Sequence, residues 1–206
     1  MITRRFLSLA AVTTPLLAGP MFTGHAWADA TDAARDLVVR LGRDLTAVAN
    51  GPEVAAARKA SLERLIYAAV DVDAVARFCL GRFWRGATPQ QQKDYTDLFR
   101  AVLVRNIAGK AGEYKGVVMD VGKAQPHEED VAVTSVVTRP GIAPSKVDWI
   151  VSSASGSPRI IDVIAEATSL RLTQRSDYAA FLASHGNNVQ ALIDAMKTRA
   201  VAPAPG

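Results

Sequence analysis

The chain has few of the residues that cross-link small proteins or bind metals. Among its 206 residues it has one cysteine and three histidines, which excludes an intrachain disulfide framework and a cysteine-based zinc site. Aromatic residues make up only 6%, and the basic residues are scattered with no aromatic ladder between them. The net charge of +4 therefore gives no indication of nucleic-acid binding. With 49% hydrophobic residues, the sequence is typical of one globular domain stabilised by its core.

Common catalytic and nucleotide-binding motifs are also absent. The sequence contains no G-x-x-x-x-G-K-[ST], G-x-G-x-x-G or G-x-S-x-G motif. Three acidic residues follow His127, but adjacent side chains cannot readily all point at one ion, so an exposed turn is favoured over a metal site. Cys79 lies in an apolar run and is interpreted as a small buried hydrophobe, and His185 as a residue at a helix end. We therefore expect a protein that is not an enzyme, with no catalytic residue, metal or cofactor.

Residues 1–28 have the pattern of a secretory signal. Two arginines precede an uncharged stretch over 6–21, and the small-x-small sequence A-W-A follows, ending at Ala28. Two prolines and a glycine interrupt the stretch, which argues against a retained membrane anchor. We predict cleavage after Ala28 and export to the periplasm, by the general or the twin-arginine route. The processed chain is then one domain over 29–199 with a loose tail over 200–206, and not an integral membrane protein.

The spacing of apolar residues changes in the middle of the chain. Before Gly116 they recur at helical intervals, most regularly from Tyr95 to Ile107, behind a helix start at Thr88-Pro89. After Gly116 the interval falls to two, which predicts strands over 117–121, 131–138, 147–153 and 160–165. Helical intervals return over 168–184 and 188–198.

This order of elements predicts an α+β fold. The connections between the strands are too short for crossover helices, so the four strands form an antiparallel sheet. Helices from both ends of the chain cover this sheet, and we expect an apolar pocket between the sheet and the helices.

The segment over 76–89 combines large apolar side chains with arginines. Phe78, Leu80, Phe83 and Trp84 either fill the interior or form the wall of a lipid pocket that has arginines at its rim. Arginine suits that second role because its planar fork donates paired hydrogen bonds to phosphate. The residue pattern leaves both interpretations open.

Two other classes of function remain possible on the residues alone. A small α+β enzyme would place an Asp base and a Tyr donor in one cavity, and Tyr95, Asp97, Tyr114 and Asp162 supply the residue types without specifying the geometry. An adaptor with a purely structural role would bind partners and hold no lipid.

Several motifs in order resemble one known family. The stretch RFCLGRFWRGATPQQQKDYTDLFRAVLVRNIAGKAGEYKG over 77–116 is similar to the L-G-R-[YF]-W-R … [TS]-P-x-Q … L-[VI]-R … EY-x-G core of the MlaC family, periplasmic phospholipid-binding proteins also called toluene-tolerance proteins. VDWIV and IIDVIAEATSLRLTQRSDYAAFLASHGNNVQALIDAM resemble its later strands and closing helices. The resemblance runs from 34 to 196, with departures at 165–167 and 106–107.

The resemblance implies a soluble carrier with a deep apolar pocket for phospholipid acyl chains. Its implied partners are an outer-membrane complex of the MlaA type and an inner-membrane ABC transporter with an MCE domain, and its role is to maintain outer-membrane lipid asymmetry. Related proteins are associated with hopanoids, so another lipid is an alternative cargo. The lipid-binding residues are predicted from their positions on the apolar faces of the helices and strands and from the general location of the family's pocket. They are Phe83, Trp84, Leu103, Ile107, Tyr114, Val133, Trp149, Ile161 and Val163. We also predict that Arg175 forms a structural contact and not a contact to lipid, with Asp162 as its candidate partner.

Overall fold

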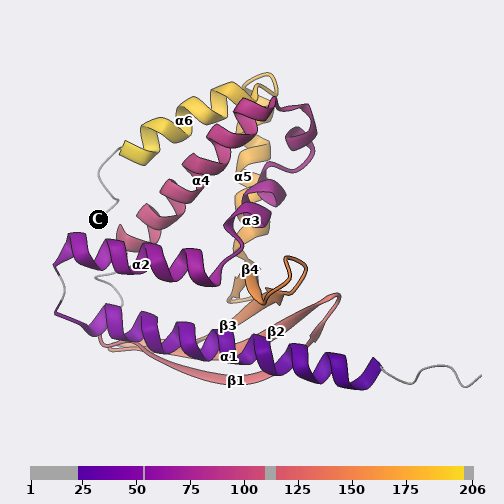
Figure 1. Ribbon diagram of the computed structural model, residues 1–206. Helices are drawn as coiled ribbons and strands as arrows, with labels where there is room; N and C mark the ends of the chain where they lie inside the picture. The colour runs from indigo at the N-terminus through magenta and orange to yellow at the C-terminus, as the bar shows by residue number, and fades with distance from the viewer. Residues whose placement is uncertain (1–22, 53, 110–114, 202–206) are drawn as a thin grey trace, which may run out of the picture.

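A computed structural model of the chain describes residues 23–52, 54–109 and 115–201 (Figure 1). Residues 1–22 of the predicted signal, 202–206 of the predicted tail and Tyr114 lie outside the described residues. Within the described ranges, no helix is both long enough and apolar enough to cross a membrane. Helices precede and follow one run of strands, as predicted for an α+β fold.

The first half of the chain is helical. Its elements are α1 (Thr23–Asn50), α2 (Ala55–Ala69), α3 (Val72–Leu80), the 3₁₀ helix η1 (Gly81–Gly86) and α4 (Pro89–Gly109). The predicted start of α4 is confirmed. The Thr88 hydroxyl accepts a hydrogen bond from the Gln91 backbone N–H at 3.2 Å, and the Gln91 side chain accepts one from the Thr88 N–H at 3.0 Å. This capping box satisfies two amide groups that a helix start leaves unpaired.

The second half of the chain begins with an antiparallel meander. Its strands lie in the sheet in chain order: β1 (Val118–His127), β2 (Asp130–Arg139), β3 (Ile142–Ser152), β4 (Arg159–Ala165) and β5 (Thr168–Ser169). The expected number of four strands is one too low. The two residues of β5, predicted as the start of a helix, pair with Ile164 and Ala165 of β4. A strand of two residues is too short to leave an alternating pattern in the sequence. Helices α5 (Leu170–Ser184) and α6 (Val189–Val201) follow.

Helix α1 lies along one face of the sheet (Figure 1). Gly42 of α1 faces Met119 of β1, and a Cβ at Gly42 would lie 2.5 Å from the Met119 methyl carbon. The missing side chain thus allows α1 to approach β1 closely. We call the buried apolar residues between this face, α1 and α2 the sheet cluster: Ala34, Val38, Leu41, Ala69, Val131, Val133, Val151 and Ile160.

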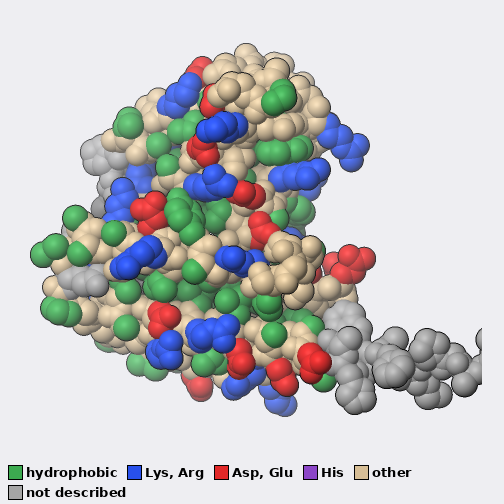
Figure 2. All heavy atoms as spheres, viewed as in Figure 1, with side chains coloured by type: hydrophobic (Ala, Val, Ile, Leu, Met, Phe, Trp, Pro, Cys, Tyr) green, Lys and Arg blue, Asp and Glu red, His purple; other side chains and the backbone are tan. Residues whose placement is uncertain are grey.

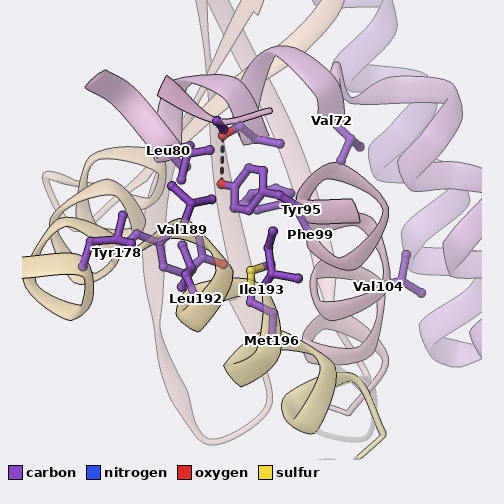
Figure 3. Close-up of a cluster of buried hydrophobic side chains, with 14 of the residues drawn as sticks. Val72, Leu80, Tyr95, Phe99, Val104, Tyr178, Val189, Leu192, Ile193 and Met196 are labelled. Carbon is purple, nitrogen blue, oxygen red and sulfur yellow. Dashed lines mark hydrogen bonds between the residues drawn. The ribbon is translucent and has the colours of Figure 1, made fainter. Parts of the chain in front are cut away.

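The other helices enclose a second set of buried side chains, the helical cluster (Figure 3). At its centre the Tyr95 hydroxyl donates a hydrogen bond to the Ala76 carbonyl at 2.9 Å. Burial raises the pKa of Tyr95, so this hydroxyl remains a neutral donor. The ring centres of Trp84, Phe99 and Tyr178 lie 6.5, 6.0 and 6.1 Å from that of Tyr95, in tilted or edge-to-face contacts. Its other buried members include Val72, Cys79, Leu80, Leu182, Leu192, Ile193 and Met196.

Strand β4 connects the two clusters. Where α2 ends and α3 begins, Val70 forms a parallel bridge with Ile160, and the Asp71 N–H donates to the Ile160 carbonyl at 3.0 Å. The Arg159 guanidinium donates to the carbonyls of Tyr67 and Ala68 at 2.9 and 2.6 Å. Val70 packs against both clusters, so the chain between α2 and α3 is held to the sheet by backbone and side-chain contacts.

Asp162 of β4 holds the start of α5. One carboxylate oxygen accepts hydrogen bonds from the backbone N–H groups of Val163 and Arg171 at 2.8 and 3.1 Å. The other accepts one from the Ser169 hydroxyl at 2.6 Å and lies 3.4 Å from the Arg171 Nε. The predicted partner, Arg175, is therefore wrong: Arg171, one helical turn earlier, forms the ion pair. The Arg175 guanidinium instead lies over an aromatic ring of α3.

Removing the Asp162 carboxylate is expected to destabilise the protein strongly. Asp162→Ala leaves two amide groups and a hydroxyl without their acceptor, and a guanidinium without its ion-pair partner, in a site where the side chain is 4% exposed. We expect the free energy of unfolding, measured by urea denaturation, to fall by about 3 kcal/mol. The control is Asp97→Ala, which removes exposed ion pairs with Lys93 and Arg100 and should cost less than about 1 kcal/mol. Equal losses in the two variants would contradict the proposed role of Asp162.

The turn between β4 and β5 is strained, because Glu166 and Ala167 have φ values of 50° and 61°. Ala167→Gly should relieve this strain and raise the free energy of unfolding by about 0.5 kcal/mol, after the greater freedom of glycine in the unfolded chain is subtracted. Ala180→Gly, at an exposed position inside α5, should instead lower it by about 1 kcal/mol. Urea denaturation of both variants tests the opposite signs.

Candidate functional site

Three predicted lipid-binding residues form one row across the sheet. Val133 of β2 is opposite Trp149 of β3, and Trp149 is opposite Val163 of β4. Because directly opposite residues of antiparallel strands point to the same face, all three side chains lie on the face covered by α1. Val133 is fully buried, whereas Trp149 and Val163 are half-buried.

A hydrogen bond to Ser135, which lies two residues after Val133 on β2, orients Trp149. Its indole N–H donates to the Ser135 hydroxyl at 2.9 Å, and this hydroxyl lies 3.4 Å from the Val147 carbonyl that accepts its hydrogen bond. Ser135 is fully buried. The polar group of the indole is thereby satisfied within the sheet, so the half-buried remainder of the ring offers only apolar surface.

Further half-buried apolar side chains surround this row. They pack against the sheet cluster without being covered by it, and they come from α1, α2 and β1: Leu37, Leu45, Leu65, Met119 and Val121. In Figure 2 hydrophobic side chains gather between the helical part at the top and α1 at the bottom. Because these apolar side chains are only partly covered, the surface that they form can bury a further apolar group. We call Trp149, Val163 and these five residues the apolar face.

The other predicted residues lie elsewhere. Phe83, Trp84, Leu103 and Ile107 are half-buried and pack against the helical cluster. Ile161 is the extra residue of a β-bulge, since Ile150 pairs with Asp162 and Val151 with Ile160. The structure thus brings Val133, Trp149 and Val163 together and does not place the four helical residues in the same cluster.

Two of the hollows on the surface of the described residues lie near the predicted site. One, of about 470 Å³, lies where β3 and β4 approach the β4–β5 turn. The other, of about 940 Å³, lies among α3, η1, α4 and α5. Trp84 is the one predicted lipid-binding residue in the lining of either hollow, so the expected pocket between sheet and helices stays a prediction.

The candidate nucleophile and acid–base residues have structural roles. Cys79 is buried as predicted, and desolvation raises the pKa of its thiol to about 12, so it stays protonated at neutral pH. The Tyr95 hydroxyl is hydrogen-bonded inside the helical cluster, and Asp162 accepts hydrogen bonds from Ser169 and Arg171 at the start of α5. Asp97 forms ion pairs on the exposed side of α4. His185 lies at the C-terminal end of α5, as predicted, and stacks on Phe181 with 3.9 Å between the ring centres. Among the described residues, no group of three or more His, Cys, Asp or Glu side chains is arranged to hold a metal ion.

Sequence reasoning missed two features of these sites. Ser135, which orients Trp149, looks like any polar residue in a strand, and only the strand register places the two side chains together. Arg175 joins the arginines of the 77–85 segment, although about ninety residues of sequence separate them. Neither relation has a local sequence signal, because both depend on which elements pack together.

Comparisons with known proteins identify the fold and the family of this chain. A solved structure, the phospholipid-binding protein from Ralstonia solanacearum in complex with a phospholipid, has a similar fold, with a TM-score of 0.71. The two sequences are 23% identical, and the match covers 81% of this chain and 96% of that one. The profile of the MlaC protein family matches residues 35–198. This chain therefore belongs to the MlaC protein family.

Proposed function

We propose that this protein binds phospholipid by burying acyl chains against the apolar face. The observation that carries the proposal is the row of Val133, Trp149 and Val163, in which Trp149 and Val163 are left half-buried beside α1 and α2. Membership of the MlaC family supports it, as does the phospholipid bound to the similar protein from Ralstonia solanacearum.

The energetics of acyl-chain burial suit a carrier. Each buried CH₂ group contributes about 0.8 kcal/mol, so a chain of about sixteen carbons gains about 12 kcal/mol relative to water. A bilayer provides nearly the same stabilisation, so transfer between membrane and protein is close to neutral. Direction must then come from partners. Because apolar burial is not directional, the same face would accept several phospholipids, or a hopanoid as an alternative cargo.

Membership of the MlaC family supports a wider role. We propose a periplasmic carrier, exported and cleaved after Ala28, that shuttles phospholipid between an MlaA-type outer-membrane complex and an inner-membrane ABC transporter with an MCE domain. Binding without chemistry agrees with the structural roles of Cys79, Tyr95 and Asp162. An enzyme with an Asp/Tyr pair would instead need both groups free in one cavity.

The cargo itself provides the first test. Native mass spectrometry of protein purified from bacterial periplasm without detergent should show an added mass, and lipid analysis of the extract should identify phospholipids. A hopanoid would change the cargo and keep the site. A protein that carries no lipid, and takes up none from liposomes, would contradict the carrier and favour an adaptor.

Filling the apolar face should weaken lipid binding. Val163→Trp adds a large apolar group where acyl carbons would lie, and we expect at least tenfold weaker lipid binding. This loss corresponds to about 1.4 kcal/mol of binding free energy, or the burial of roughly two CH₂ groups. Displacement of a fluorescent fatty acid gives the affinity. The control is Val136→Trp on β2, whose side chain is 41% exposed and points to the opposite face of the sheet. Equal affinities in folded variants, checked by circular dichroism, would place the acyl chains elsewhere.

A further inference from the structure

The larger hollow, among α3, η1, α4 and α5, is lined by four arginines. Arg77 comes from α3, Arg82 and Arg85 from η1, and Arg175 from α5. Its volume of about 940 Å³ lies within the range of small-molecule sites. Figure 2 shows Lys and Arg side chains along the right-hand side of the helical part. We call this site the arginine hollow.

The positive charge of the arginine hollow is not neutralised locally. Asp73 is the one acidic residue in its lining, and its carboxylate forms an ion pair with Arg100, which is not part of the lining. Among the described residues, no ion pair joins any of the four lining arginines to a carboxylate. The hollow therefore has an excess of positive charge, which attracts an anion.

Aromatic rings position three of the guanidinium groups. The guanidinium carbons of Arg77, Arg82 and Arg175 lie 5.8, 4.8 and 4.9 Å from the ring centres of Trp84, Phe83 and Phe78, respectively. Stacking stabilises the cation against the ring face and leaves the N–H groups at the edge of its plane for other acceptors. These rings thus hold the arginines in place and do not occupy their hydrogen-bonding groups.

Gly81 leaves room for Arg175 in the hollow. The glycine ends α3 with a φ of 59°, and a Cβ at this position would lie 3.3 Å from three atoms of the Arg175 guanidinium. A side chain there would compete with the guanidinium for space. The glycine of the L-G-R-F-W-R sequence therefore allows an arginine of α5 to join the arginines of the same sequence.

We infer that the arginine hollow binds a phosphate-type oxyanion. Arginine forks donate paired hydrogen bonds to such oxygens, and a concave site lined by four arginines suits a compact group of high charge. An acidic protein surface is less well matched, because a stable protein interface buries about 800 Å² on each partner and needs a broader contact. The phosphate is that of a lipid headgroup or of a soluble phosphate compound. The inference goes beyond acyl-chain binding and does not require it.

Calorimetry with inorganic phosphate and with glycerol phosphate, at constant ionic strength, tests the soluble source. Co-sedimentation with phosphatidylcholine vesicles, with and without phosphatidylglycerol, tests the headgroup. The variant R77Q/R175Q should weaken binding of the active probe at least tenfold. The control R40Q/R43Q removes two exposed charges from α1 and should change binding less than twofold. R77K/R175K keeps the charge and removes the forks, so it should also weaken binding several-fold.

The outcomes separate the possibilities. If the unmodified protein binds soluble phosphate and R77Q/R175Q does not, the ligand is a soluble phosphate compound. If the unmodified protein binds only vesicles and R77Q/R175Q loses that binding, the ligand is a lipid headgroup. Polyglutamate, titrated in the same way, serves as the acidic-peptide control. Several results would overturn the inference: no binding of any phosphate probe, binding of polyglutamate but not of phosphate, equal weakening in R40Q/R43Q, or full affinity in R77K/R175K. Melting temperatures of all variants exclude unfolding as the cause. Since inorganic phosphate needs no acyl site, failure of lipid carriage would leave its titration unchanged.

Discussion

The buried carboxylate of Asp162 is the group on which the arrangement of the two clusters depends. It lies on β4, at the side of the sheet where the chain turns back into helices, and it accepts hydrogen bonds from the first residues of α5. Two residues earlier on the same strand, Ile160 is bonded to the chain between α2 and α3. One strand therefore holds two of the connections between the sheet and the helical cluster. A buried acceptor with several donors is costly to disrupt, so this connection is rigid.

The two parts of the molecule that β4 joins carry two different kinds of surface. The apolar face lies on the sheet beside α1 and α2, where burial is non-directional and tolerant of chain length. The arginine hollow lies among α3, η1, α4 and α5, where hydrogen bonds are directional and recognise charge. Trp149 and Trp84 show the difference. The indole N–H of Trp149 is hydrogen-bonded within the sheet, whereas the ring of Trp84 stacks against the guanidinium of Arg77.

Local signals in the sequence predicted most elements of the fold. Thr88 with Pro89 marked the start of α4, and the change of spacing at Gly116 marked the start of the sheet. Strand β5 was missed because two residues cannot show a period. The choice of Arg175 as the partner of Asp162 was wrong because Arg171 lies one helical turn away with the same charge. For the site, Val133 and Trp149 were both among the predicted residues, and the register of β2 and β3 places them directly opposite each other.

The sequence by itself determined the class of fold, the alternation that gives the sheet one apolar face, and the family to which the chain belongs. These are properties of spacing and order, which each segment carries without its neighbours. The tertiary structure decided that Phe83 and Trp84 pack against the helical cluster, whereas Trp149 packs against the sheet cluster. It also decided that Arg175 faces the arginines of η1 across Gly81. Such contacts join segments distant in sequence, and they depend on packing geometry that no local pattern encodes.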